Sequence, residues 1–158
     1  MSLPLPYIKR VEIFQKLVYA VSKSLNPIAI FFTTSEKIVP TTMYIKQIDQ
    51  DGFTSPFGLI NVRFFSINED NTSFMDTVGL HTLGLPDFQI RYNKLNPTEV
   101  AGSLYAYAEY IYKNGSVILN GNTVEGIQAD SKWECVYQGA SLEPKRNVLQ
   151  INIHKDQK

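Results

Sequence analysis

One short segment of the chain gathers most of the side chains that could do acid–base chemistry. Between residues 76 and 88 the sequence carries His81, one of only two histidines, together with Asp76 and Asp87. A carboxylate can orient an imidazole, and histidine changes charge near neutral pH, so such a set could transfer protons. These three residues are the candidates for catalysis, although the sequence favours a structural role for His81. The alternative is a turn histidine that packs or hydrogen-bonds locally.

The same segment is rich in residues that shape the backbone, namely Gly79, Gly84 and Pro86. Glycine N–H groups could cradle a phosphate. However, the spacing matches neither a phosphate-binding P-loop nor a dinucleotide fingerprint, and no Lys-Ser or Lys-Thr pair follows. We interpret the three residues as turn-shaping positions that carry the chain from a hairpin to its next strand.

The sequence predicts no metal site and no cofactor. Two histidines far apart and a single cysteine give no ligand pair at a useful spacing for zinc. A carboxylate cation site built from Glu69, Asp70 and Asp76 is an alternative. The pair Asp70-Asn71 is better explained as part of a hairpin turn, because both residue types tolerate turn dihedrals.

The single cysteine, Cys135, alternates with Trp133 and Tyr137 on one face of an expected strand. This pattern predicts a packed thiol and not a nucleophile. One cysteine cannot form an internal disulfide, which favours a reducing, cytoplasmic location. No Gly-x-Ser-x-Gly nucleophile elbow occurs, so hydrolase chemistry of that type is unsupported.

Four tyrosines fall within eight residues of an expected helix: Tyr105, Tyr107, Tyr110 and Tyr112. Tyrosine offers apolar area with a polar tip, so these side chains could line an aromatic pocket or a protein interface. The alternative is that Tyr105, Tyr107 and Tyr112 belong to the core or its rim. Tyr110 falls on the outer face of the helix and is the candidate to contact a partner.

Composition excludes several classes of partner. The 158 residues include 15 Lys+Arg and 15 Asp+Glu, and the net charge is +0. Nucleic acid binding needs clustered excess cations, which this chain does not show. We likewise expect no membrane partner, because no apolar run approaches the roughly 20 residues of a spanning helix and basic runs are short. The N-terminus also lacks the pattern of a signal peptide.

The sequence predicts two long helices. Residues 7–25 have an amphipathic pattern that ends at Asn26-Pro27. Its expected buried half comprises Val11, Ile13, Phe14, Leu17, Val18, Ala20, Val21 and Leu25, with Gln15 on the polar half. The second helix follows Asn96 as N-cap and Pro97 at its first position, and it closes at Asn114-Gly115.

The remaining pattern predicts a short helix and a set of strands. We expect a short helix near 40–48, a buried strand at 28–32, a hairpin of 59–67 with 73–78 across a turn at 68–71, and a strand at 88–92. Further strands are expected at 117–119 and 122–124, joined as a hairpin by Asn120-Gly121, and at 133–137 and 148–153, before a frayed tail at 154–158. The fold class is therefore α+β, with a mainly antiparallel mixed sheet of about six or seven strands and two principal helices packed on one face.

The span from Val11 to Ile153 resembles the bacterial domain-of-unknown-function 4261 family. The matching signals are the helix before 28–32, Val39-Pro40, Thr77-Val-Gly-Leu80, Leu83-Gly84, Asp87-Phe-Gln-Ile90, Tyr110-Ile-Tyr112 before Asn114-Gly115, Asn120-Gly-Asn-Thr123, and Pro144-Lys-Arg-Asn-Val-Leu149. The resemblance implies the order of elements and no activity. It also implies that the chain could be the C-terminal part of a longer protein.

These observations lead to one domain over 1–158, with an ordered core at 7–153, and to two hypotheses on function. The first, which the sequence favours, is a protein-interaction module without enzymatic activity, either a homodimer or docked to another protein, since no catalytic constellation is evident and aromatic residues are abundant. The second is a small-molecule-binding domain or enzyme whose cleft lies at the 76–88 turn. The second hypothesis requires His81 to meet Asp76 or Asp87 within hydrogen-bond reach in a concave pocket.

Overall fold

A computed structural model describes residues 5–67 and 71–153. The chain divides into two compact units, Met1–Ile60 and Asn61–Lys158. Most of the turn expected at 68–71 and all of the tail expected at 154–158 lie outside the described residues, as do Glu69, Asp70 and His154. The expectation of a single domain stays a prediction.

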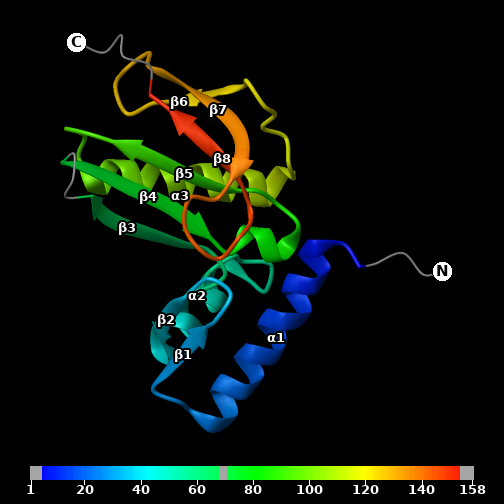
Figure 1. Cartoon of the computed structure of the whole chain (residues 1–158). Coiled ribbons are helices and arrows are strands. Elements are labelled where there is room, and N and C mark those ends of the chain that lie inside the picture. Colours follow the sequence, from blue (N-terminus) through cyan, green and yellow to red (C-terminus); the bar gives the residue numbers. More distant parts are fainter. Residues whose placement is uncertain (1–4, 68–70, 154–158) are drawn as a thin grey trace. The chain divides into compact units, whose positions relative to one another are not determined.

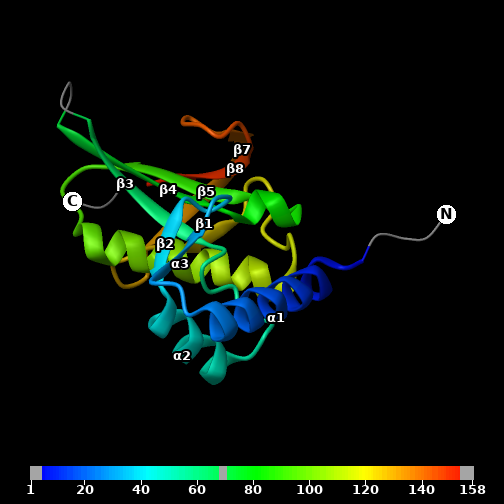
Figure 2. The same cartoon turned by 90° about the horizontal axis from the view of Figure 1, so that it is seen from below.

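The first unit is a small α+β assembly. It contains α1 (Tyr7–Leu25), β1 (Ala29–Phe32), β2 (Lys37–Pro40) and α2 (Thr41–Asp51). The two strands form an antiparallel hairpin, and α1 packs with α2. Figure 2 shows the two helices of this unit side by side. The long first helix and the short second helix are confirmed, whereas β2 has no counterpart among the strands expected from the sequence.

Only part of the side of α1 that the sequence predicted to be buried is buried: Val11 is, but most of the large apolar residues beyond it are exposed. Gln15, assigned to the polar face, is fully buried, with Val11 and Ser22 on the same side. Its side-chain amide donates to the carbonyl oxygens of Ser55 (2.8 Å) and Phe57 (3.0 Å), and its carbonyl accepts from the Tyr44 hydroxyl (2.6 Å). Because every polar atom of the amide side chain finds a partner, its burial is tolerated. The more apolar side of the helix is left exposed.

The expected buried strand at 28–32 is likewise only half buried. Phe32 and Val39 face the interior, but Phe31 and its cross-strand partner Ile38 are exposed, and Ile28 is 95% exposed. Residues directly opposite each other in an antiparallel pair point to the same face. A two-stranded hairpin covered on one side therefore leaves its other face open, whatever the residue types on it.

The second unit is a six-stranded mixed sheet with one long helix (Figure 1). The strands are β3 (Asn61–Ile67), β4 (Thr72–Val78), β5 (Asp87–Tyr92), β6 (Thr123–Glu125), β7 (Lys132–Gly139) and β8 (Asn147–Asn152), in the order β3-β4-β5-β8-β7-β6. Only β5 and β8 pair in parallel. The α+β class and the mainly antiparallel mixed sheet are confirmed. The helix α3 (Pro97–Asn114) packs against β3, β4 and β5, whereas α1 makes its helix contacts with α2 in the first unit.

The ends of α3 follow the sequence signals closely. The side chain of Asn96 accepts a hydrogen bond from the Thr98 N–H (2.9 Å), and Gly115 closes the helix at a φ of 82°. The hairpin expected around Asn120-Gly121 is wrong, because β6 pairs with β7 instead. The two residues still form a turn, in which the Asn122 N–H donates to the Leu119 carbonyl (3.0 Å).

The ladders of the sheet bring distant residues to one end of it. Pairing of β3 with β4 sets Arg63 opposite Asp76, and the parallel pairing of β5 with β8 sets Asp87 opposite Val148. Arg146 directly precedes β8, so its side chain lies beside the start of β5 and the end of β4. The alternate residues Phe88, Ile90, Leu149 and Ile151 are buried on the opposite face, where the Phe88 ring contacts Tyr107 of α3.

We expect Cys135 to give the stability of the protein a signature at high pH. The thiol is free and fully buried, and burial raises its pKa from the ordinary value of 9.0 to about 11. In this interval the unfolded chain loses the thiol proton while the folded chain keeps it, so the free energy of unfolding falls as pH rises through the interval. Chemical denaturation from about pH 8 to 11 should show a shallower decline for Cys135→Ala than for the wild type. Equal slopes would contradict the assignment.

Candidate functional site

The segment between β4 and β5 is a compact turn held by its own backbone. A single turn of 3₁₀ helix, Leu80–Leu83, lies between Gly79 (φ 129°) and Gly84 (φ 85°). These dihedrals are unfavourable for residues with a side chain, which accounts for glycine at both places. The Leu85 N–H donates to the Leu80 carbonyl (3.2 Å) and fixes the exit of the turn. The turn places His81 beside Asp87, the first residue of β5.

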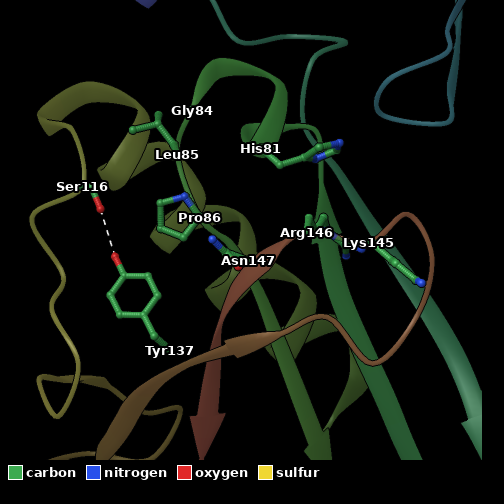
Figure 3. A pocket seen from close by; sticks show the side chains of 9 residues that line it. All are labelled: His81, Gly84, Leu85, Pro86, Ser116, Tyr137, Lys145, Arg146 and Asn147. Atoms are coloured by element: carbon green, nitrogen blue, oxygen red, sulfur yellow. Dashed lines mark hydrogen bonds between the residues drawn. The ribbon is translucent and has the colours of Figure 1, made fainter.

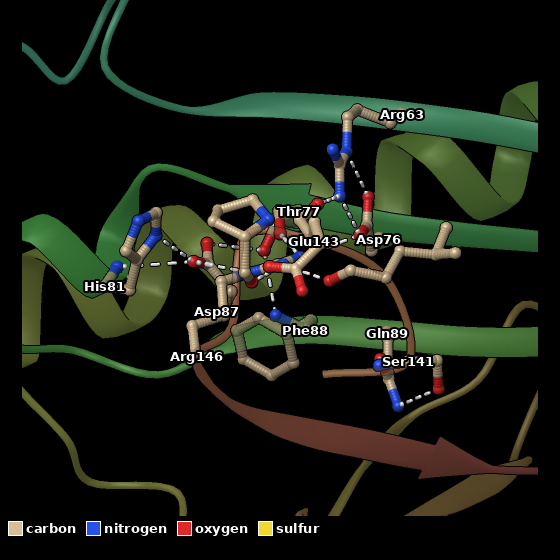
Figure 4. Close-up of polar contacts among 12 residues, drawn as sticks. Arg63, Asp76, Thr77, His81, Asp87, Phe88, Gln89, Ser141, Glu143 and Arg146 are labelled. Atoms are coloured by element: carbon tan, nitrogen blue, oxygen red, sulfur yellow. Dashed lines mark hydrogen bonds and ion pairs between the residues drawn. The ribbon is translucent and has the colours of Figure 1, made fainter. Parts of the chain in front are cut away.

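Asp87 is the acceptor around which this turn is built. Its carboxylate is fully buried and accepts hydrogen bonds from the Thr77 hydroxyl (3.1 Å) and from the backbone N–H groups of Leu80 (3.2 Å) and His81 (3.3 Å). The fourth contact is to Nδ1 of His81, at 2.8 Å. Every one of these partners can donate, so the aspartate acts as an acceptor throughout (Figure 4).

The contact with Asp87 selects one tautomer of His81. An imidazole that donates from Nδ1 keeps the lone pair of its other nitrogen, Nε2. Among the residues that the structure describes, Nε2 of His81 has no hydrogen-bond partner. The side chain of His81 is 23% exposed, whereas that of Asp87 is fully buried. The pair therefore has the geometry of a carboxylate-oriented imidazole whose free nitrogen can exchange a proton with a bound molecule.

Asp76 lies in the same polar cluster but does not contact His81. Its carboxylate receives two hydrogen bonds from the Arg63 guanidinium, at 2.9 and 2.6 Å, and one from Arg146, at 2.7 Å. Such paired contacts hold a carboxylate in one orientation. Of the three candidate catalytic residues, the structure thus brings His81 and Asp87 together and gives Asp76 a supporting position behind them.

Arg146 joins the two buried aspartates and was not singled out from the sequence. Its side chain is 1% exposed. One terminal nitrogen, Nη2, donates to Asp76 and to the Thr77 carbonyl, and the other, Nη1, donates to the carbonyls of Leu142 and Pro144. Its Nε lies 3.3 Å from Asp87, an ion pair without hydrogen-bond geometry. Two arginines therefore balance two carboxylates in this cluster.

A cavity of about 430 Å³ opens beside the turn. It is lined by His81, Gly84, Leu85, Pro86, Ser116, Tyr137, Lys145, Arg146 and Asn147. Figure 3 shows His81 and Lys145 on one side of it and the Ser116 and Tyr137 hydroxyls, which are 2.9 Å apart, on the other. No carboxylate is among the lining residues, and Lys145 makes no ion pair with a described residue. The cavity thus offers cationic and hydroxyl groups to a guest.

The tyrosines of α3 have three different environments. Tyr112 is buried at 3% exposure, Tyr105 is half-buried, and Tyr110 is 53% exposed. Tyr110 and Tyr107 line a second hollow, of about 780 Å³, with residues 117–118 and 122–125. The Tyr107 hydroxyl donates to the Glu125 carbonyl, and burial raises the pKa of Tyr107 to about 12. Of the three tyrosines proposed to bind a partner, Tyr110 is therefore the most accessible.

Two kinds of functional feature, a metal-binding cluster and a membrane-spanning helix, are absent from the described residues. No group of three or more His, Cys, Asp or Glu side chains among them could hold a metal ion. Within the same residues, no helix combines the length and the apolar character that crossing a bilayer requires.

Comparison with known proteins links the cavity to a family. Residues 76–152 match the model of a family described as a domain of unknown function (DUF4261). The resemblance inferred from the sequence is confirmed over this segment, which contains Asp87 and every residue that lines the cavity. No curated protein matches the chain, and no solved structure matches it either.

Proposed function

We propose that residues 76–152 form a binding site for a small anionic molecule, and that His81 exchanges a proton with the bound molecule. The observation that carries this proposal is the 2.8 Å contact between Nδ1 of His81 and the buried carboxylate of Asp87, at the wall of a cavity of about 430 Å³. A carboxylate-oriented imidazole in a concave site is the arrangement that the second hypothesis from the sequence required.

The charge of the lining favours an anion as the guest. Lys145 presents an ammonium group that no described carboxylate neutralises, and Asn147 adds an amide. The charge of Arg146 is already directed to Asp76 and Asp87, so we assign it to the framework and not to the ligand. Hydroxyls of Ser116 and Tyr137 can orient a polar group on the far wall.

The chemistry open to such a site is general acid–base catalysis. Nε2 of His81 can accept a proton from the ligand, and the Asp87 carboxylate stabilises the imidazolium that results. Asp87 is itself held by two backbone N–H groups and the Thr77 hydroxyl, so the imidazole is oriented before a ligand arrives. The reaction class supported here is proton transfer to or from a small anionic substrate.

The proposal is tested by titrating the purified chain with inorganic phosphate, AMP and succinate in a calorimeter. We expect at least one of the three to bind, and Lys145→Gln to weaken that binding about tenfold, since a charged hydrogen bond is lost. His81→Gln should weaken it less and should abolish the proton release or uptake that accompanies it. The matched control is Lys132→Gln, an exposed lysine at the far end of β7.

Equal affinities for the wild type and Lys145→Gln would overturn the assignment of the anion, as would an equal loss in Lys132→Gln. Proton exchange that persists in His81→Gln would overturn the role of His81. Binding of none of the three probes by the wild type would count against the anionic class.

The remaining expectations on function stay predictions. A homodimer or a protein partner was inferred from the tyrosines of α3, and Tyr110 is the one with accessible area for it. A cytoplasmic location is supported by the single unpaired thiol of Cys135.

A further inference from the structure

The exposed side of α1 carries a continuous apolar stripe. Ile13, Phe14, Leu17, Val21 and Leu25 are between 42% and 75% exposed, although large apolar side chains of this kind usually pack inward. They recur at intervals of three and four residues, so they share one side of the helix. From Ile13 to Leu25 the stripe runs for about 18 Å, the length of more than three helical turns.

One border of this stripe is a row of lysines. Lys9, Lys16 and Lys23 are seven residues apart and therefore lie one above another on the helix surface. Their only acidic neighbour on α1 is Glu12, which both Lys9 (2.8 Å) and Lys16 (2.7 Å) share. With Arg10, the helix has four cations and one anion, a net charge of +3 (4 − 1), in a chain with no net charge.

We propose that this face of α1 docks an acidic amphipathic helix of another protein. An apolar stripe flanked by charges spaced seven residues apart is the pattern of a helix-pairing surface, in which the flanking charges select the partner. Glutamates on a partner helix would meet the lysine row while its apolar residues cover the stripe. This site lies in the first unit and is independent of the small-molecule site in residues 76–152.

Two other occupants fit the charges less well. A second copy of α1 in antiparallel orientation brings one lysine row against the other, and like charges across a helix pair are destabilising. An anionic membrane surface gains about 1 kcal/mol for each cation near it, but this gain does not depend on the seven-residue spacing of the lysines, which a helical partner uses.

The experiment uses the whole chain and a pair of designed peptides. Each peptide is a helix of about four turns with leucine at the core positions; one has glutamate at the flanking positions and the other has lysine there. Fluorescence anisotropy should show the acidic peptide binding at least tenfold more tightly than the basic one, with an affinity that falls as salt is raised. Lys9→Glu/Lys16→Glu/Lys23→Glu should reverse this preference.

Leu17→Asp should abolish binding of the acidic peptide, whereas the matched control Leu119→Asp, at a similarly exposed leucine of the second unit, should leave it unchanged. Far-UV circular dichroism checks that each variant keeps its helices. Equal affinity for the two peptides, or no affinity for either, overturns the proposal. So does concentration-dependent dimerisation in sedimentation velocity that Leu17→Asp removes, or preferential binding of phosphatidylserine vesicles through the same residues.

Discussion

Arg146→Met is expected to destabilise the protein by about 3–5 kcal/mol, the cost of removing one partner from a buried ion pair. The substitution keeps much of the side-chain volume but leaves Asp76 with Arg63 as its only cation among the described residues. It also removes the cation 3.3 Å from the buried carboxylate of Asp87. Four hydrogen bonds from Nη1 and Nη2 are lost as well. Urea unfolding followed by the fluorescence of Trp133, the single tryptophan, measures the effect in the unit concerned.

Two further variants separate the charge effect from simple loss of an arginine. Arg91→Met changes an exposed arginine on β5 and should cost below about 1 kcal/mol. Arg146→Lys keeps a positive charge near the two buried carboxylates but lacks the guanidinium fork, so it should cost less than Arg146→Met. A small effect of Arg146→Met, comparable with that of Arg91→Met, would contradict the bridging role.

Gln15→Glu is expected to destabilise the first unit by about 2–4 kcal/mol at neutral pH. The change preserves shape but replaces the donating amide nitrogen by a carboxylate oxygen, which then faces the carbonyl oxygens of Ser55 and Phe57. Only the hydrogen bond from the Tyr44 hydroxyl survives. Because a protonated carboxyl group can donate again, the loss should shrink as pH is lowered. Urea unfolding followed by far-UV circular dichroism at two pH values measures it.

The control is Gln50→Glu, which makes the same chemical change at an exposed position of α2. It should shift the unfolding midpoint little at either pH. A loss in Gln15→Glu that equals the loss in Gln50→Glu would mean that the buried amide does not hold α1 against the 55–57 segment.

Much of the fold could be predicted because local signals agree with the tertiary structure. The Asn96 cap, the glycine after α3 and the inward residues Leu149 and Ile151 of β8 were interpreted correctly. The strand β5 was placed correctly but is buried on both faces, because Gln89 is as buried as Phe88 and Ile90. The buried side of α1 was not predicted correctly. Periodicity locates the apolar side of a helix, but it cannot tell whether the rest of the protein covers that side. Gln15 is buried through partners 29 to 42 residues away, which no local pattern contains.

The sequence predicted only part of the candidate site, because short spacing reveals local contacts but not contacts between distant residues. Asp87 is six residues from His81, and the turn between them makes their contact a local event. Arg146 is 70 residues from Asp76, and only the parallel pairing of β8 with β5 brings the two together. The run Pro144-Lys-Arg contributes to the resemblance to the family. Its two adjacent basic residues were the one sequence signal that could have pointed to Arg146 as part of the site. The second wall, with Ser116 and Tyr137, depends on the same long-range pairing.

In the proposed site, Asp87 orients His81, which presents Nε2 to a bound anion. A long-range ¹H–¹⁵N correlation spectrum of the ¹⁵N-labelled chain at about pH 8 reports which imidazole nitrogen carries the proton. His81→Gln identifies the signals that belong to this residue. We expect the proton on Nδ1, and a shift of the Nε2 resonance when the tightest of phosphate, AMP and succinate is added. A proton on Nε2 would show that Asp87 does not orient the imidazole, and a spectrum that saturating ligand leaves unchanged would show that Nε2 does not meet the anion.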